Sequence, residues 1–148
     1  MRLIFTRGDG LANRLIRAFE GGDWDHVGII DGDHVIEATA SHGVRRRLLA
    51  SLQADRPVHE IVNVPGIPGQ EGMALQWARK QVGKPYDWGG VVGFLFWRGS
   101  WAATGSWYCS ELGALTLALS GRQVAGQHRR VGVRMLYALA HAWACAAG

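Results

Sequence analysis

The chain has 148 residues, of which 48% are hydrophobic and 19% are charged, proportions typical of one domain with a real core and not of a disordered chain. Its formal net charge is +4, and the basic residues are scattered apart from short runs at Arg45–Arg47 and His128–Arg130. No aromatic platform or reader motif accompanies these runs, so nucleic acid is not an expected partner. Peripheral contact with an anionic membrane or cell wall is compatible with this charge.

The first part of the chain is predicted to consist of strands with one early helix. A short strand covers Arg2 to Thr6, and a helix follows that ends at Gly21–Gly22. The apolar residues that share one face of this helix are Leu11, Leu15, Ile16 and Phe19.

Two short β-branched runs then flank Asp31–Gly32, and Asp-Gly is among the strongest signals for a β-hairpin. Further strands are predicted at Gly43–Leu49 and His59–Val64. Residues Pro65–Gly69 can form neither a helix nor a central strand and make the most plausible internal boundary.

The second part of the chain is predicted to be helical. An amphipathic helix covers Gln70 to Lys84, and a second helix runs from Cys109 to a closing Gly121. The second helix is apolar around nearly its whole circumference, which is typical of a buried helix. A last helix follows in Val133–Gly148, with Leu136, Leu139 and Trp143 expected to pack. In the helix over Gln70 to Lys84, Met73, Trp77 and Val82 are expected to supply much of the apolar side, and Gly83 is expected to cap the helix.

This order of elements favours an α+β fold with an antiparallel sheet. One domain over residues 1–148 is expected, with a sheet-rich part at about 1–64 and a helix-rich part at about 70–148. The N-terminus lacks the apolar stretch of about 7–15 residues found in signal peptides, and no segment approaches the roughly 20 residues needed to span a bilayer. We expect a protein made in the cytoplasm, with delivery to the envelope left open.

Cys109 is the first of two cysteines, and two cysteines do not form a disulfide framework. It stands where a Gly- and Ser-containing loop gives way to a helix. In the first helical turn, unpaired N–H groups and the helix dipole favour a thiolate. The competing interpretation is a small buried core residue, which is also what we expect of Cys145.

A nucleophilic cysteine needs a base, and the base needs an orienting group. With Asp31–Gly32 as a two-residue loop, His26 falls directly opposite Glu37 on one face of the hairpin. Glu37 lies in an otherwise apolar strand, where a carboxylate normally has a partner. The other five histidines have no comparable companion in the local sequence.

Four motifs, "DHVGII", "HVIEA", "GKPYDWGG" and "WYCSEL", resemble in this order the circularly permuted NlpC-type papain-like cysteine hydrolases of the YiiX/YebB-like group. The resemblance covers roughly Arg2 to Gly121. It implies an antiparallel sheet packed against a buried helix that bears the cysteine at its N-terminus. It also implies Cys109 as nucleophile, His26 as base and then acid, and Glu37 as the orienting group. Tyr86 matches a family tyrosine near the thiol, where it donates to an oxyanion or anchors the loop.

The resemblance implies hydrolysis of an amide or peptide bond through an acyl-enzyme, without a metal or another cofactor. The expected substrate is a peptide, a muropeptide or a lipid amide. Lipid or ester acyl transfer and a non-catalytic binding role on the same fold are alternatives, as is a nucleotide-binding loop at "GDGLAN". The Trp-rich segment Trp88–Trp107 is either a wall of the site or part of the core.

Overall fold

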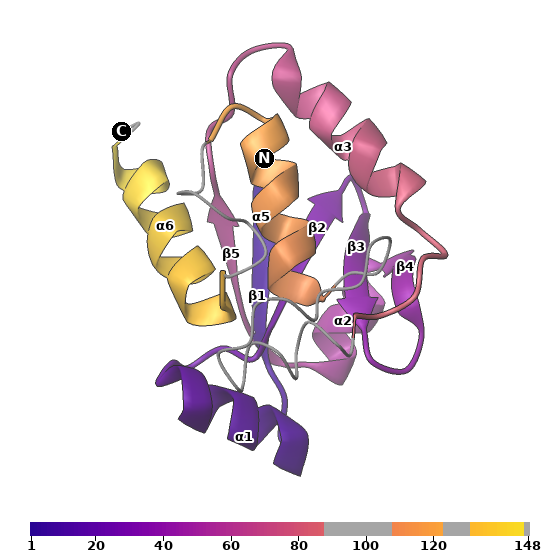
Figure 1. Cartoon of the computed structure of the whole chain (residues 1–148), viewed down its shortest axis with the longest axis vertical. Helices are drawn as coiled ribbons and strands as arrows, with labels where there is room; N and C mark the ends of the chain where they lie inside the picture. Colours follow the sequence, from indigo (N-terminus) through magenta and orange to yellow (C-terminus); the bar gives the residue numbers. More distant parts are fainter. Residues whose placement is uncertain (88–107, 123–130, 147–148) are drawn as a thin grey trace.

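The computed structural model describes residues 1–87, 108–122 and 131–146, and they form a five-stranded sheet and five helices (Figure 1). The strands are β1 (Arg2–Arg7), β2 (His26–Asp31), β3 (His34–Thr39), β4 (Gly43–Leu48) and β5 (Val58–Asn63). The helices are α1 (Leu11–Glu20), α2 (Leu49–Asp55), α3 (Gln70–Lys80), α5 (Cys109–Leu119) and α6 (Val133–Cys145). The expected α+β class with an antiparallel sheet is confirmed.

The sheet has the strand order β4-β3-β2-β1-β5, and every neighbouring pair is antiparallel. The central strand is β2, and all six of its residues are buried. A strand that is buried on both sides reads as a continuous apolar run and not as an alternating one. The central position of β2 therefore follows from its sequence.

Helices cover both faces of this sheet. Helix α5 lies over the centre of one face, against β2 and β3, with α3 on one side of it and α6 on the other (Figure 1). Helix α2, which the sequence analysis missed, packs on β3 and β4 through the buried Leu52. Leu52 belongs to a smaller core cluster with Ile4, Ile30 and Val35.

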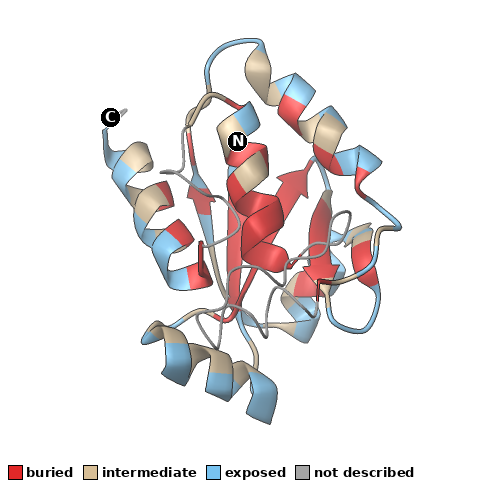
Figure 2. Cartoon of the chain, viewed as in Figure 1, coloured by how far each residue is buried: buried red, intermediate tan, exposed pale blue. Residues whose placement is uncertain are grey.

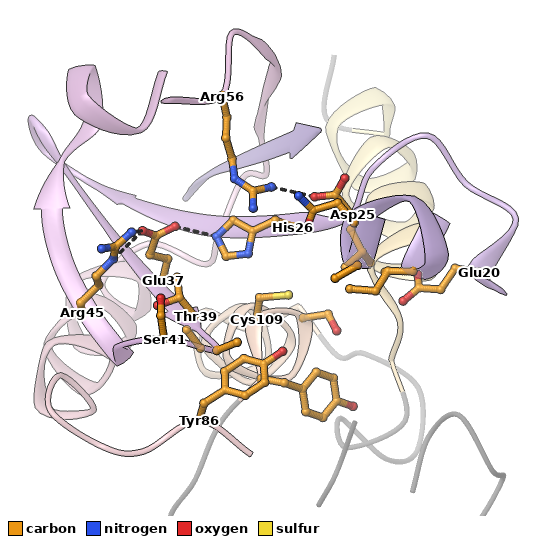
Figure 3. Close-up of a pocket in the computed structure, with 18 of the residues that line it drawn as sticks. Glu20, Asp25, His26, Glu37, Thr39, Ser41, Arg45, Arg56, Tyr86 and Cys109 are labelled. Atoms are coloured by element: carbon orange, nitrogen blue, oxygen red, sulfur yellow. Dashed lines mark hydrogen bonds and ion pairs between the residues drawn. The ribbon is translucent and has the colours of Figure 1, made fainter. Parts of the chain in front are cut away.

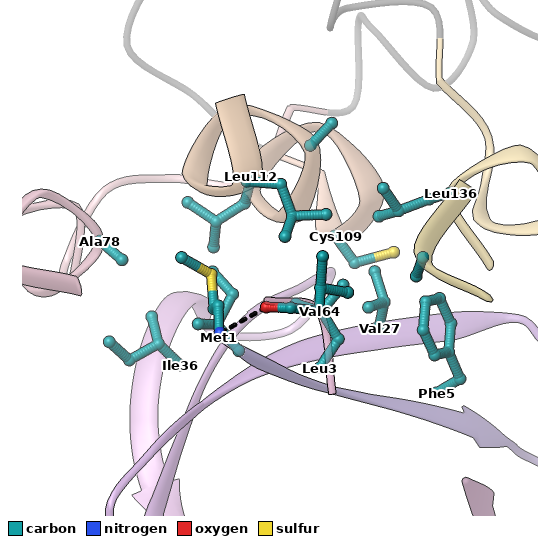
Figure 4. Close-up of a cluster of buried hydrophobic side chains, with 14 of the residues drawn as sticks. Met1, Leu3, Phe5, Val27, Ile36, Val64, Ala78, Cys109, Leu112 and Leu136 are labelled. Carbon is teal, nitrogen blue, oxygen red and sulfur yellow. Dashed lines mark hydrogen bonds between the residues drawn. The ribbon is translucent and has the colours of Figure 1, made fainter. Parts of the chain in front are cut away.

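The main core lies between the sheet and α5 (Figures 2 and 4). It includes Phe5 and Val27 from the sheet, Leu112 from α5 and Leu136 from α6, all at most 1% exposed. The approach is close at Gly113, where a Cβ would lie 3.1 Å from Leu136 Cδ2. Burial all round α5, apart from its C-terminal residues, confirms the buried helix predicted from its composition.

Three sequence predictions about local structure are wrong. The hairpin turn consists of Gly32–Asp33 and not of Asp31–Gly32, because Gly32 supplies the positive φ of +64° at the first loop position. Met73 and Val82 are 62% and 41% exposed, while the short residues Ala74 and Ala78 hold α3 against the core. Helix α3 also ends at Lys80, before Lys84, and its C-cap is Gln81 and not the predicted Gly83.

The remaining helix predictions are confirmed or lie outside the described residues. Gly21 and Gly121 have φ values of +64° and +90° at the ends of α1 and α5, as expected of glycines that close helices. Leu136 is fully buried, and Leu139 and Trp143 pack against the core as partly buried residues. The Trp-rich segment Trp88–Trp107, predicted as a wall of the site or part of the core, lies outside the described residues. Within the described ranges, no helix is both long enough and apolar enough to span a bilayer.

Candidate functional site

Cys109 is the first residue of α5, and it is 9% exposed. The preceding residue, Tyr108, has extended backbone (φ −104°, ψ 163°), and its side chain makes no capping hydrogen bond to the helix. The N–H groups of the first turn are therefore not satisfied by that side chain, and the positive end of the helix dipole lies at the sulfur. This is the position that the sequence predicts for an activated thiol.

His26 lies between Glu37 and Cys109 (Figure 3). Its Nε2 is 2.6 Å from Glu37 Oε2, and the Cys109 sulfur lies on the other side of the ring, where the two residues line the same cavity. Since Nε2 faces the carboxylate, Nδ1 is the nitrogen left for the sulfur. The three residues come from β2, β3 and the N-terminus of α5, so one histidine joins the sheet to the helix.

The strand register that brings His26 and Glu37 together differs from the predicted one. Ile29 pairs with Ile36 and Asp31 with His34, so paired residue numbers sum to 65 and not to 63. Asp31 is held inside the strand by the guanidinium groups of Arg46 and Arg79, which moves the turn one residue later. The shift on β3 is two positions, which keeps the same face, so His26 and Glu37 meet as diagonal neighbours.

Two arginines of β4 hold the other oxygen of Glu37. Arg45 lies directly opposite Glu37 and donates from Nε to Oε1 at 2.9 Å, and Arg47 Nε is 2.8 Å from the same oxygen. The sequence analysis noted the basic run at Arg45–Arg47 but gave these arginines no partner. Alternation along a strand puts Arg45 and Arg47 on one side, and that period could have identified them.

These contacts shift the pKa values of both partners in opposite directions. Burial alone would lower the pKa of His26, but the hydrogen bonds and charges of Cys109 and Glu37 outweigh it and raise the pKa to about 9. Burial would raise the pKa of Glu37, but His26 and the two arginines lower it to about 2. At neutral pH the imidazole is therefore protonated and the carboxylate ionised.

We expect these two groups to set a pH window for stability. The folded pKa of His26 lies above its unfolded value of 6.5, so its contribution is complete below pH 6.5 and is lost as the pH rises through about 9. The folded pKa of Glu37 lies below 4.5, so its contribution is present above pH 4.5 and is lost as the pH falls towards about 2. Urea unfolding from pH 3 to 10 should show the largest joint contribution of the two groups to the free energy of unfolding between pH 4.5 and pH 6.5. A His26→Gln variant that loses as much stability above pH 7 as the wild type would contradict the assignment of this loss to His26.

Tyr86 lines the same site, and the backbone of its segment fixes it there. Val44 donates to the carbonyl of Lys84 and Gly83 donates to that of Val44, both at 2.8 Å. This approach requires Gly43, because a Cβ there would lie 2.3 Å from the Lys84 oxygen. Burial, and then the charge of Cys109, raise the pKa of the Tyr86 phenol, which keeps its proton and can donate.

Asp25, which the sequence analysis did not single out, fixes the start of β2. Its buried carboxylate accepts from the Gly8 N–H at 3.0 Å and pairs with Arg17 of α1 and, at 2.7 Å, with Arg56. Because Asp25 directly precedes His26, this network ties the backbone at the imidazole to α1 and to the end of α2. The signal in the sequence that could have identified Asp25 is its position directly before His26, at the start of a predicted strand.

A cavity of about 360 Å³ opens beside Cys109, His26 and Glu37. Its other walls come from α1, from the segment after β3 and from Tyr86 and Tyr108 (Figure 3). The thiol, the imidazole and the phenol thus face one space large enough for part of a substrate. Within the described ranges, no group of three or more His, Cys, Asp or Glu side chains could hold a metal ion.

The second cysteine and one further histidine lie away from this site. Cys145 is exposed near the end of α6, so the expected burial of its side chain is wrong, and both cysteines are free thiols. His141, for which no companion was expected, has Nε2 2.9 Å from Glu60 Oε1, and Tyr137 donates to the other oxygen of that carboxylate at 2.8 Å. These contacts fasten α6 to β5.

Comparisons with protein-family models and with curated proteins give no match for this chain.

Proposed function

We propose that the protein is a cysteine hydrolase that cleaves an amide bond through an acyl-enzyme, with Cys109, His26 and Glu37 as its triad. The observation that carries the proposal is the placement of His26, whose imidazole contacts Glu37 at 2.6 Å and has the Cys109 sulfur on its other side (Figure 3). A nucleophile, a proton carrier and an orienting carboxylate in series are the parts that such catalysis needs. The order His, Glu, Cys along the chain fits the circularly permuted papain-like arrangement.

In the first half of the reaction, the Cys109 thiolate attacks the carbonyl carbon and forms a C–S bond. The oxyanion lies near the N–H groups of the first turn of α5 and the Tyr86 hydroxyl, which stabilise the developing charge. His26 starts as an imidazolium, since its pKa is raised to about 9, and gives its proton to the leaving nitrogen as the C–N bond breaks.

In the second half, the neutral His26 takes a proton from water, and the resulting hydroxide attacks the thioester. The C–S bond breaks, the carboxylic acid leaves, and the thiolate–imidazolium pair is restored. Glu37 stays ionised throughout because its pKa is lowered to about 2, and it holds the imidazole in position. The two arginines on Glu37 support the same role.

The proposed substrates are cell-wall peptides or related amides. Acyl esters and lipid amides are the second candidate, because Ala12, Ile16 and Phe19 of α1 give one side of the cavity an apolar wall. Both classes present a carbonyl to the same thiol. The choice between them depends on what fits along that wall.

A substrate panel tests the proposal directly. Wild-type protein and the Cys109→Ala variant are incubated with muropeptides, N-acyl amides and acyl esters, and the products are followed by mass spectrometry. We expect turnover by the wild type and a loss of at least about a thousandfold in the variant, since removal of a triad nucleophile leaves only residual catalysis. Cys145→Ala is the matched control and should keep full activity. Equal product formation by wild type and Cys109→Ala would refute the proposal.

A further inference from the structure

Arg56, which follows α2, is an arginine of the cavity wall that keeps hydrogen-bond donors unused. Of the arginines that line the cavity at the thiol, Arg45 and Arg47 both contact Glu37. Arg56 donates to the described residues through Nη1 alone, to Asp25 Oδ1 at 2.7 Å and to a threonine hydroxyl at 3.4 Å. Its Nε and Nη2 contact no acceptor in the described part of the chain.

These two nitrogens form the edge of the guanidinium group that suits a carboxylate. A guanidinium presents five N–H groups in a fixed fork and binds a carboxylate through two parallel hydrogen bonds. Arg79 holds Asp31 in this way, with Nε at 2.9 Å and Nη2 at 2.6 Å from the two oxygens. The Arg56 side chain is 23% exposed, and its guanidinium group points towards His26 (Figure 3). The same edge of Arg56 can therefore bind a carboxylate that enters the cavity.

Polar contacts fix which side of α1 faces this part of the cavity. Arg17 pairs with the buried Asp25, whereas Leu11 and Leu15 are 75% and 62% exposed on the opposite side of the helix. Asn13 is four positions before Arg17 and lies on the same side as Arg17. Helix α1 therefore presents Asn13 to the cavity, which Asn13 lines.

Asn13 and Arg56 meet at Gly8. A Cβ at Gly8 would overlap Nδ2 of Asn13 and lie 3.2 Å from Nη1 of Arg56, so the close approach of both side chains requires glycine there. In the described part of the chain, the Asn13 side chain makes no hydrogen bond, and its amide has N–H groups to donate. Two donor groups from different elements thus stand side by side on one wall of the cavity.

The charge on this wall favours an anion. The Asp25 carboxylate lies between two guanidinium groups, those of Arg17 and Arg56, so the three carry one net positive charge. Glu20, another carboxylate of the lining, accepts from the first turn of α6 and is seven residues beyond Asn13, about 10 Å along the helix. The carboxylate of the proposed triad is held by the imidazole and two arginines. The exposed charged residues next to α1 cancel one another, and they are Arg7, Asp9, Arg14 and Asp23.

Arg56 lies on the imidazole side of the thiol. It pairs with Asp25, which directly precedes His26 in the chain, and Figure 3 shows its guanidinium group directed at the imidazole. In the proposed reaction, His26 gives its proton to the leaving nitrogen, so the leaving amine lies on this side. A carboxylate bound by Arg56 therefore belongs to the leaving amine.

We propose that Arg56 and Asn13 bind a carboxylate on the leaving amine, so that the substrates are N-acyl amino acids or peptides with a free C-terminal carboxylate. This inference rests on the proposed function for the direction of the substrate. The carboxylate takes no part in bond breaking. Water cleaves the C–N bond through the acyl-enzyme, and the products are the acyl group as a carboxylic acid and a free amino acid.

Equilibrium binding to the Cys109→Ala variant tests the subsite without any chemistry. The probes are N-acetyl dipeptides, each prepared as the free acid and as the C-terminal carboxamide, and ligand-observed NMR measures their dissociation constants. We expect the free acids to bind about ten to a hundred times more tightly than their carboxamides. Arg56→Gln in this background should bring that ratio to about one, and Asn13→Ala should lower it about threefold. Arg79→Gln, which removes a guanidinium group that pairs with Asp31 outside the cavity lining, is the matched control and should keep the ratio.

Melting temperatures of the same variants separate loss of the subsite from loss of the fold. In Arg56→Gln the Asp25 carboxylate keeps Arg17 and the Gly8 N–H, so the variant should stay folded. Should it unfold, Asn13→Ala decides, and an unchanged ratio in that variant would overturn the proposal. Equal affinity for acids and carboxamides in the parent, no binding of any free acid, or a preference that folded Arg56→Gln retains would also overturn it.

Turnover of the same pairs by the wild type distinguishes this inference from the proposed function. Faster hydrolysis of the free acids supports both. Acid-selective binding without hydrolysis supports the subsite and counts against the proposed function. Equal hydrolysis of acids and carboxamides overturns the subsite alone.

Discussion

Iodoacetamide will alkylate Cys109 at least about ten times faster than Cys145 at pH 7, although Cys145 is the more exposed thiol. Accessibility alone predicts the opposite order, because Cys109 is only 9% exposed. The expected reversal comes from the helix N-terminus and from the protonated His26, both of which favour the thiolate, the form that reacts. Peptide mapping of the labelled protein over time measures both rates in one sample.

The His26→Ala substitution should slow labelling of Cys109 by a further factor of about ten to a hundred. It should leave Cys145 unchanged, which makes the second thiol an internal control. His34→Ala, an exchange of a histidine on the same hairpin, should alter neither rate. Slow labelling of both cysteines at one rate in the wild type would exclude an activated thiol at the start of α5.

The Glu37→Gln substitution should lower the free energy of unfolding by about 3 kcal/mol, a large loss for a single exchange. The side chain is 1% exposed, and the amide would leave His26, Arg45 and Arg47 near one another without a compensating charge. Repulsion would also lower the pKa of His26. Urea unfolding at pH 7 measures the first effect, and NMR titration of the imidazole measures the second.

Asp33→Asn is the matched control for this experiment. Asp33 also pairs with a histidine, His34, but its side chain is 79% exposed. Exposed pairs contribute little to stability, so this exchange should leave the unfolding curve unchanged. If Glu37→Gln unfolds at the same urea concentration as the control, the charge network does not stabilise the hairpin as described.

The pairing of His26 with Glu37 could be predicted from sequence because it requires only that the two side chains lie on the same face of the hairpin. It does not require the exact strand register. A shift of two positions moved the turn but kept both side chains on one face of the hairpin. The N-terminal position of Cys109 could be predicted because glycine and apolar composition define both ends of its helix. Local signals therefore placed the thiol and the imidazole on the right elements.

Other features depend on contacts that a local pattern does not contain. The period of α1 identified Leu11 and Leu15 as one face, but the buried Asp25 decides that this face turns outward, by pairing with Arg17. On α3, close packing against α5 selects Ala74 and Ala78 over the larger Met73. In each case the deciding partner lies on another element of the fold.

The two arginines that hold Glu37 also affect how the protein meets other molecules of itself. β4 is an edge strand of the sheet, and an edge strand is where the backbone of another chain can add. The backbone of Gly83 and Lys84 covers this edge only at Val44, where it makes two hydrogen bonds. Arg45 and Arg47 lean towards Glu37 on one face of β4, and Arg46 reaches Asp31 on the other. A strand with three consecutive cations is a poor template for edge-to-edge association, because a second copy would bring like charges together. The residues that fix the carboxylate beside His26 thus also disfavour aggregation at this edge.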